Sequence, residues 1–186
     1  HRVRIAVSTS YWPLAWPSPE PVLLSLFTGA SRLELPVRGP RGEDDRLRPF
    51  GEPEAAPPPE HTALAPARLQ RTIERDLSTN ETVYTTFVDG GDFGAAGLAR
   101  VDAIDLELGH SIRKRFRVRD DPLSARAEIE QETRLSRGGW SARVETRTAF
   151  RATRETFELH AELRAFEGES AVFERIWDQS IPRDGV

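Results

Sequence analysis

Residues 124–165 read SARAEIEQETRLSRGGWSARVETRTAFRATRETFELHAELRA, and this stretch decides the fold class. From Ala125 to Leu135 the odd-numbered positions are uncharged, whereas every even-numbered position from Arg126 to Arg134 carries a charge. Ala, Glu, Gln and Arg favour helices, but a helix would spread these charges over several faces and leave no apolar stripe. The period of two therefore predicts a β-strand with one wet face.

The next two segments repeat this alternation, at residues 142–151 and 157–165. The connections between the three segments, at residues 137–139 and 152–155, are short enough for hairpins. A last strand is expected over residues 171–177, after a glycine turn. Together these segments predict an antiparallel meander in which one face of the sheet is solvated.

Charge predicts the register of the first hairpin. A two-residue turn at Gly138–Gly139 would oppose Glu132 to Glu145 and Arg134 to Arg143. A turn centred one residue later places Trp140 in the loop and opposes Arg134 to Glu145, Glu132 to Arg147 and Glu128 to Arg151. Because directly opposed like charges destabilise paired strands, we predict the second register.

Strand-like patterns continue outward from this stretch, and two proline-rich segments interrupt them. The expected strands lie at residues 3–7, 22–28, 33–37, 69–73, 82–88, 101–108 and 112–118, with Gly109 separating the last two. Residues 11–21 read YWPLAWPSPEP, and residues 39–67 hold seven of the 14 prolines. Proline lacks a backbone donor, so both segments should be extended and unpaired, apart from a turn around residues 42–47.

About ten strands with long proline-rich connections and no βαβ rhythm predict an all-β, mainly antiparallel jelly-roll β-sandwich. The 186 residues suit one domain, so we expect residues 1–186 to form it, with residues 39–67 as a loop. The chain begins with His1 and contains no methionine, and we therefore expect it to be a piece of a longer protein.

Composition excludes several classes of protein. The net charge of −4 argues against a nucleic-acid-binding surface, which needs clustered positive charge. No apolar run approaches the ~20 residues that cross a bilayer. The absence of cysteine excludes disulfides and every site built on a thiol. It leaves the compartment open, with the cytoplasm favoured.

The sequence contains no catalytic centre that we can assemble. Residues 29–33 (GASRL) come nearest to the G-x-S-x-G nucleophile motif but lack its second glycine. The four histidines fall at a terminus, in a loop, after a turn and at an outward charged position: His1, His61, His110 and His160. Residues 89–92 (DGGD) are interpreted as a hairpin turn, with a weak calcium site as the alternative. We expect no catalytic residue, no cofactor and no metal ligand.

Aromatic residues and prolines concentrate at residues 11–21, and the sequence allows three uses for them. They could contact another domain, pack within this one, or stack on a sugar together with Trp140 and Trp177. We favour a rigid contact surface, because a lone soluble domain has little reason to display such a cluster. Its expected residues are Tyr11, Trp12, Pro13, Trp16, Pro17 and Pro19. An independent carbohydrate-binding module remains the alternative.

Residues 8–13 (STSYWP) and 16–21 (WPSPEP) resemble the C-terminal domain of CocE/NonD-type hydrolases. These are the cocaine-esterase-like acyl esterases related to Xaa-Pro dipeptidyl-peptidases. The resemblance spans essentially the whole chain, through residues 31–38 (SRLELPVR), 48–50 (RPF), 120–125 (DDPLSA) and 181–186 (IPRDGV).

This resemblance implies a jelly-roll domain of the galactose-binding-domain-like type. It also implies an upstream α/β-hydrolase domain that carries a Ser-Asp-His triad, with a helical cap over part of its pocket. The family's reaction is acyl transfer to water through a serine, which cleaves esters, amides or dipeptides after proline. None of those catalytic residues has a counterpart in this sequence. The segment is expected to pack against the hydrolase domain and to help shape its cleft.

Overall fold

The computed structural model describes residues 4–91 and 95–184 of the chain. It divides into two units, residues 1–23 with 59–186 and residues 24–58, and each is described by itself. In the smaller unit a 3-10 helix, η1 (Asp44–Arg46), forms where the sequence predicts a turn. All strands of the described residues belong to the larger unit.

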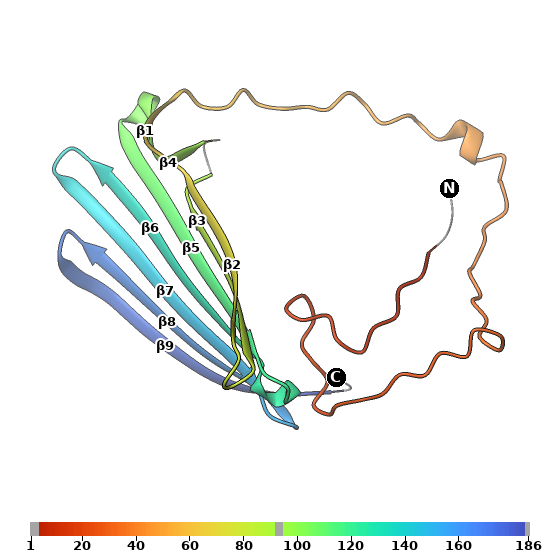
Figure 1. Ribbon diagram of the computed structural model, residues 1–186. Coiled ribbons are helices and arrows are strands. Elements are labelled where there is room, and N and C mark those ends of the chain that lie inside the picture. Colours follow the sequence, from red (N-terminus) through yellow and green to blue (C-terminus); the bar gives the residue numbers. More distant parts are fainter. Residues whose placement is uncertain (1–3, 92–94, 185–186) are drawn as a thin grey trace. The chain divides into compact units, whose positions relative to one another are not determined.

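Nine β-strands form one antiparallel sheet in the larger unit (Figure 1). Their bounds are β1 (His61–Pro66), β2 (Arg68–Asp76), β3 (Glu81–Asp89), β4 (Ala96–Val101), β5 (Leu106–Val118), β6 (Arg126–Arg137), β7 (Trp140–Ala152), β8 (Thr156–Glu167) and β9 (Ser170–Pro182). Two further 3-10 helices, η2 (Asp102–Ile104) and η3 (Pro122–Ser124), lie in the connections before and after β5. The all-β prediction is confirmed. Among the described residues no helix is long and apolar enough to span a bilayer.

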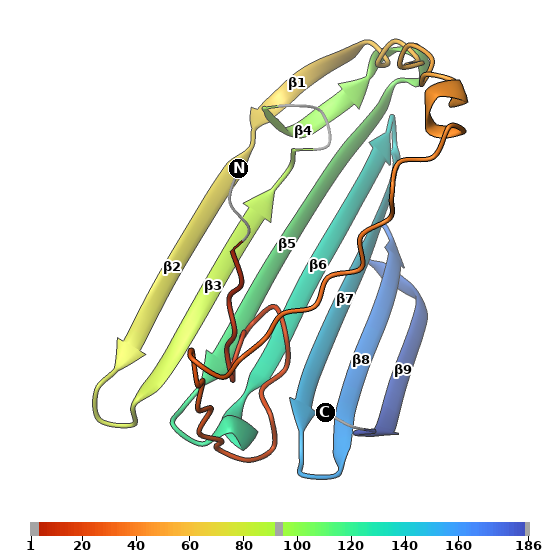
Figure 2. The same ribbon diagram turned by 90° about the vertical axis from the view of Figure 1, so that its right-hand side faces the viewer.

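The sheet is a meander over its C-terminal half, as the alternation predicts. From β5 to β9 each strand pairs with the next strand along the chain. On the other side of β5, strands β3 and β4 pair with successive parts of it, and β2 and β1 pair outside them (Figure 2). The sheet is open, with β9 at one edge and β1 and β2 at the other.

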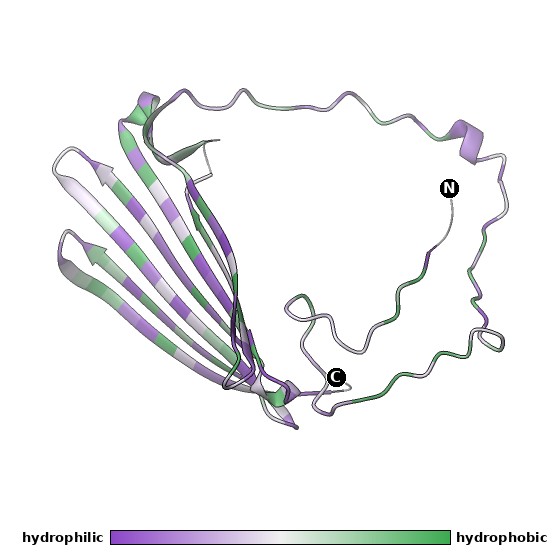
Figure 3. Cartoon of the chain, in the orientation of Figure 1, coloured by the Kyte–Doolittle hydropathy of each residue, from purple (hydrophilic) through white to green (hydrophobic). Residues whose placement is uncertain are grey.

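The two faces of the sheet differ in chemistry, because residues directly opposed on neighbouring strands lie on the same face. One row across β6, β7 and β8 contains Glu130, Arg147 and Glu162. The adjacent row contains Ile129, Thr148, Ala161 and, on β9, Trp177. Figure 3 shows the resulting hydrophilic and hydrophobic bands along each strand. We call these faces the charged face and the apolar face.

The predicted register of the β6–β7 hairpin is wrong. Glu132 lies opposite Glu145, Arg134 lies opposite Arg143, and Trp140 pairs with Arg137 at the base of a two-residue turn. Gly138 has φ of +58° whereas Gly139 has no positive φ, which is the arrangement of a type II′ turn. Such a turn matches the twist of the strands that it joins.

The opposed like charges are compensated by residues other than the ones directly opposite them. Glu132 accepts an ion pair from its own-strand neighbour Arg134 at 3.2 Å, and Arg143 pairs with Glu145 in the same way. The Arg143 guanidinium also lies 4.2 Å from the centre of the Phe166 ring. Exposed ion pairs contribute only about 0.2–1 kcal/mol, so a favourable turn geometry outweighs the charge pattern on which the prediction depended.

Several predicted strand bounds also need correction. Residues 22–28, 33–37 and the described part of 3–7 form no strand, and residue 3 lies outside the described residues. An alternating pattern is not sufficient, because a strand requires a partner for its backbone hydrogen bonds. β1 begins inside the expected loop of residues 39–67. The chain there pairs with β4, with register shifts on either side of Ala65, where an edge strand tolerates the proline at position 66.

The expected strand at residues 101–108 is divided by a turn. β4 ends at Val101, the helix η2 follows, and Asp105 adopts a left-handed conformation with φ of +49°. β5 then runs without interruption through Gly109, which pairs with Leu98 and with Arg134. A Cβ at Gly109 would lie 3.1 Å from the Leu98 side chain, so this glycine permits close packing rather than ending a strand.

Candidate interaction surface

Residues 11–21, the tryptophan–proline segment, begin with a tight turn. The Tyr11 carbonyl accepts hydrogen bonds from the backbone N–H groups of Leu14 and Ala15, at 2.8 and 2.9 Å. The rest of the segment is rich in proline, bends at residues 19–20 and belongs to no strand, so the prediction that it is unpaired with the sheet ladder is confirmed. Proline fixes φ, so little conformational entropy remains to be lost when this backbone is held against another surface.

The two tryptophans of the segment pack on the apolar face of the sheet. The Trp12 and Trp16 rings meet edge to face, with their centroids 4.7 Å apart. Trp12 lies 5.8 Å from Phe116 of β5, and Trp16 lies 4.9 Å from Phe150 of β7. Edge-to-face geometry is the favoured arrangement of aromatic rings and adds about 0.5–1.5 kcal/mol per pair beyond the area buried.

Phe157 of β8 completes this aromatic cluster. Its ring stacks on Phe150 at 5.4 Å and lies 6.0 Å from Trp16. The contacts therefore tie residues near the N-terminal end of the sequence to the ends of three central strands. Apart from Pro17, the buried apolar side chains of the described residues are all alanines, so the aromatic cluster supplies the bulkiest packing in this region.

Arg183, just after β9, fastens the tryptophan–proline segment to the sheet. Its Nη2 donates to the Pro17 carbonyl at 2.7 Å, and its Nη1 donates to the Thr153 carbonyl at 3.1 Å. Its guanidinium lies 4.8 Å from the centre of the Phe157 ring. The residue is only 9% exposed, and burial lowers the pKa of its guanidinium. An exposed ion pair, Arg154 to Glu20 at 2.8 Å, adds a second link to the segment.

The six residues predicted to form a contact surface are buried to different degrees. Pro17 is buried, and Trp12, Pro13, Trp16 and Pro19 are half-buried. Tyr11 is 66% exposed, and Leu14, which was not among the six, is 76% exposed. The packing role that the sequence allowed is therefore observed for the tryptophans, whereas the contact with another domain stays a prediction. Sequence reasoning missed Arg183, because nothing about an arginine that follows the end of a strand indicates that it is buried.

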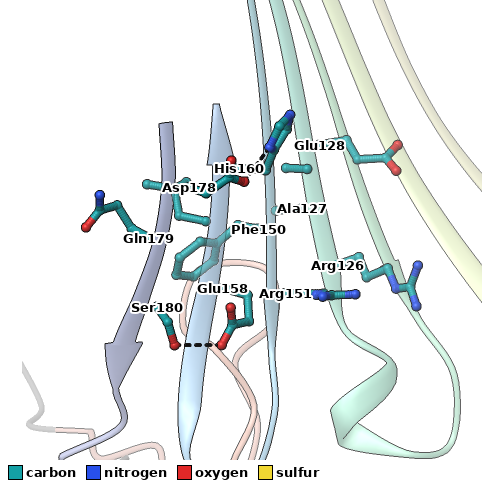
Figure 4. A pocket seen from close by; sticks show the side chains of 12 residues that line it. Arg126, Ala127, Glu128, Phe150, Arg151, Glu158, His160, Asp178, Gln179 and Ser180 are labelled. Carbon is teal, nitrogen blue, oxygen red and sulfur yellow. Dashed lines mark hydrogen bonds and ion pairs between the residues drawn. The ribbon is translucent and has the colours of Figure 1, made fainter. Parts of the chain in front are cut away.

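A cleft of about 610 Å³ lies over the charged face at this end of the sheet (Figure 4). Its lining includes a serine, a histidine and several carboxylates, which invites comparison with a hydrolase triad. Ser180 donates to Glu158 at 2.8 Å, while His160 contacts Asp178 and Glu162 at 2.7 and 3.1 Å. Both ring nitrogens of His160 are thus engaged by carboxylates, and hydrogen bonds to Asp178 and then to Glu162 raise its pKa. Ser180 donates to Glu158 and the two ring nitrogens of His160 contact other carboxylates, so the serine is not hydrogen-bonded to the histidine as a serine–histidine pair would be.

The predicted alternative of a calcium site at residues 89–92 can be examined only at its first residues, because Asp92 lies outside the described part of the chain. Asp89 as a whole residue is 8% exposed, and its carboxylate accepts from Arg68 at 2.6 Å and from Arg134 at 3.4 Å. Two guanidinium groups already neutralise this carboxylate, which disfavours a cation there. The residues described contain no cluster of three or more His, Asp or Glu side chains suited to a metal ion.

Comparisons of the chain with models of protein families, with curated proteins and with solved structures found no match.

Proposed function

We propose that this chain is the non-catalytic C-terminal domain of a CocE/NonD-like serine hydrolase, of the acyl-esterase or Xaa-Pro dipeptidyl-peptidase type. In this proposal it packs on the α/β-hydrolase domain of the same polypeptide and helps to shape the active-site cleft. The jelly-roll topology, which the resemblance to this family implies, is part of the proposal.

The observation that carries the proposal is the anchored tryptophan–proline segment. Trp12 and Trp16 hold it on the sheet, Arg183 bonds its backbone, and Tyr11 is left exposed on its turn. The same residues carry the resemblance to the hydrolase family. The segment is held in place on the side that faces the sheet and presents an aromatic side chain on the other side, which suits contact with a preformed protein surface.

The arrangement of polar groups supports a role without chemistry of its own. The serine and the histidine of the charged-face cleft are bound to different carboxylates, Ser180 to Glu158 and His160 to Asp178. The nearest sequence approach to a nucleophile motif contains Ser31, whose hydroxyl donates to the Phe27 carbonyl at 2.8 Å. Ser31 thus donates to a backbone carbonyl and Ser180 to a carboxylate, so neither hydroxyl is hydrogen-bonded to a histidine, the usual partner of a serine nucleophile.

The alternative of a carbohydrate-binding module is less favoured. Sugar binding needs aromatic ring faces that are open to solvent, whereas Trp12 and Trp16 contact each other and the phenylalanines of the sheet. Trp177 has the Arg175 guanidinium 4.9 Å from the centre of its ring.

Two assays distinguish the hydrolase-domain proposal from the carbohydrate-binding alternative. The complete gene product should hydrolyse a p-nitrophenyl ester or an Xaa-Pro p-nitroanilide, and fluorophosphonate should abolish the hydrolysis. The 186-residue chain alone should hydrolyse neither substrate, and its tryptophan fluorescence should not change on titration with oligosaccharides. A saturable fluorescence change with an oligosaccharide, together with an inactive gene product, would refute the proposal in favour of the binding module.

A further inference from the structure

We propose that the charged-face cleft binds the phosphate group of a small phosphate monoester through Arg126 of β6 and Arg151 of β7. The inference goes beyond the proposed function and does not rest on it, because both arginines belong to this chain and line the cleft. It assigns a ligand to a row of arginines that the rest of the chain does not neutralise.

Three arginines are directly opposed across the sheet. Arg117 of β5 lies opposite Arg126, and Arg126 lies opposite Arg151. Directly opposed residues share a face and have Cα atoms about 4.5–5.5 Å apart, so three positive charges form one row on the charged face. Such opposition destabilises paired strands. Among the paired residues that the structure describes, no other row brings three like charges together.

The charge of this row is not compensated within the described chain. The other two directly opposed arginines, Arg134 and Arg143, each pair with a glutamate of their own strand. Arg117, at one end of the row, pairs with a glutamate of β6 at 3.3 Å. By contrast, no hydrogen bond or ion pair joins Arg126 or Arg151 to any residue that the structure describes. Figure 4 shows both side chains at one end of the cleft.

The carboxylates that line the cleft are already engaged, and they are Glu128, Glu158 and Asp178. Glu158 lies opposite Arg151, but its Oε1 accepts from two hydroxyls, those of Thr156 at 2.6 Å and Ser180 at 2.8 Å. These hydrogen bonds lower the pKa of Glu158 more than the charge of Arg151 does. A histidine of β8 contacts Asp178 at 2.7 Å, and an arginine of β5 pairs with Glu128 at 3.3 Å. The cleft therefore offers unpaired positive charge rather than unpaired negative charge.

The adjacent row provides the space for a ligand. Ala149 lies between Glu128 and His160 in that row, and its short side chain leaves a depression between longer ones. The cleft measures about 610 Å³, which lies within the range of about 300–1,000 Å³ that is typical of small-molecule sites. This volume is larger than a single anion needs, so it leaves room for the organic part of a monoester.

The two arginines match a phosphate group better than a carboxylate. The planar guanidinium presents a fork of donors that fits the oxygens of either group. A phosphate monoester carries nearly two negative charges at neutral pH and has three acceptor oxygens, so one group can bridge two guanidiniums on neighbouring strands. A carboxylate carries one charge and would leave one of the two arginines without a counter-charge.

The test is a titration of the 186-residue chain with inorganic phosphate, glycerol 3-phosphate and acetate at constant ionic strength, followed by the arginine side-chain N–H resonances. Saturable shifts are expected at residues 126 and 151, with glycerol 3-phosphate binding more tightly than phosphate and phosphate more tightly than acetate. Arg126→Gln and Arg151→Gln should each weaken phosphate binding by about tenfold or more.

The matched control is Arg147→Gln. Arg147 lies on the same strand and face as Arg151, but it is opposed by Glu130 and Glu162, so its loss should weaken binding by less than about twofold. Equal weakening by Arg147→Gln and Arg151→Gln, or the lack of a saturable shift, would overturn the site. Acetate that binds as tightly as phosphate would overturn the phosphate assignment. Inorganic phosphate that binds as tightly as glycerol 3-phosphate would overturn the monoester.

Urea denaturation tests the site through stability and shows whether the variant folds. Arg126→Gln removes the central charge of the row, so it should raise the urea midpoint in phosphate-free buffer. Added phosphate should raise the midpoint of the unmodified chain and leave that of Arg126→Gln nearly unchanged, because a ligand stabilises the folded state that binds it. A lower midpoint for Arg126→Gln without phosphate would show that the row is not repulsive and would overturn the inference.

Discussion

The turn between β6 and β7 provides a sharp test of the register, because its two glycines should respond differently to the same substitution. Gly138 has φ of +58°, whereas Gly139 has no positive φ, and a Cβ at either position would meet no atom within 4 Å. The free-energy cost of replacing either glycine by alanine therefore comes from the backbone conformation alone. A non-glycine residue held in such a region costs about 1–3 kcal/mol.

Part of this cost is offset in the unfolded chain. Replacing glycine by alanine reduces the entropy of the unfolded state and stabilises the fold by about 0.4–1 kcal/mol where the native conformation is compatible. Gly138→Ala should thus lower the free energy of unfolding by about 1–2 kcal/mol, and Gly139→Ala should leave it unchanged or raise it by about 0.4–1 kcal/mol. Urea denaturation of the 186-residue chain, followed by far-UV circular dichroism, measures both.

The opposite order would refute the reasoning. A turn centred one residue later would make Gly139 the first central residue, and Gly139→Ala would then be the destabilising substitution. It would also oppose Arg134 to Glu145 instead of Glu132 to Glu145. A cross-strand nuclear Overhauser contact between the backbones of residues 132 and 145 should accompany the larger effect at Gly138.

Three further predictions concern charge and close packing. Hydrogen bonds raise the pKa of His160 above its ordinary value of 6.5, so its stabilising effect should be present below pH 6.5 and disappear as the pH rises through the raised pKa. The difference in free energy of unfolding between the unmodified chain and His160→Gln should follow this course. A difference that does not change with pH would contradict it. Gly90→Ala should lower the free energy of unfolding by more than about 3 kcal/mol, because a Cβ there would lie 2.3 Å from the backbone of residues 96 and 97. A Cβ at Gly91 meets no atom within 4 Å, so Gly91→Ala should cost only the backbone strain. Equal urea midpoints for the two variants would contradict the close packing at Gly90. Asp89→Asn should lower the free energy of unfolding by about 1–3 kcal/mol through its weakened bonds to Arg68 and Arg134, and a neutral effect would show that this buried carboxylate is not needed.

The sequence predicts the strands of the meander well, because their period of two is repeated from one strand to the next. The segment from Ala125 to Leu135 has enough helix formers to mislead a propensity argument, yet all of it after Ala125 lies in β6 with its charges on one face. When one face of a sheet is buried, the alternation of polar and apolar residues determines the strand more strongly than intrinsic helix propensity does. This alternation can be seen in the sequence without a structure.

Features that depend on backbone geometry or on distant contacts were not predictable in the same way. The register of the first hairpin depends on the φ of Gly138, which charge counting ignores. The burial of Arg183 depends on a carbonyl at Pro17, which is far away in the sequence. The apolar alternation at residues 33–37 resembles that of the meander, but no ladder forms there, because pairing needs a partner strand that local pattern does not specify.

The central claim is that this chain serves a serine nucleophile that lies outside its own 186 residues. Labelling the complete gene product with a fluorophosphonate and locating the modified serine by mass spectrometry tests this claim most directly. The account predicts a single labelled serine in an α/β-hydrolase domain that precedes this chain. Labelling of a serine within the chain, such as Ser31 or Ser180, or an active gene product that takes up no label, would contradict it.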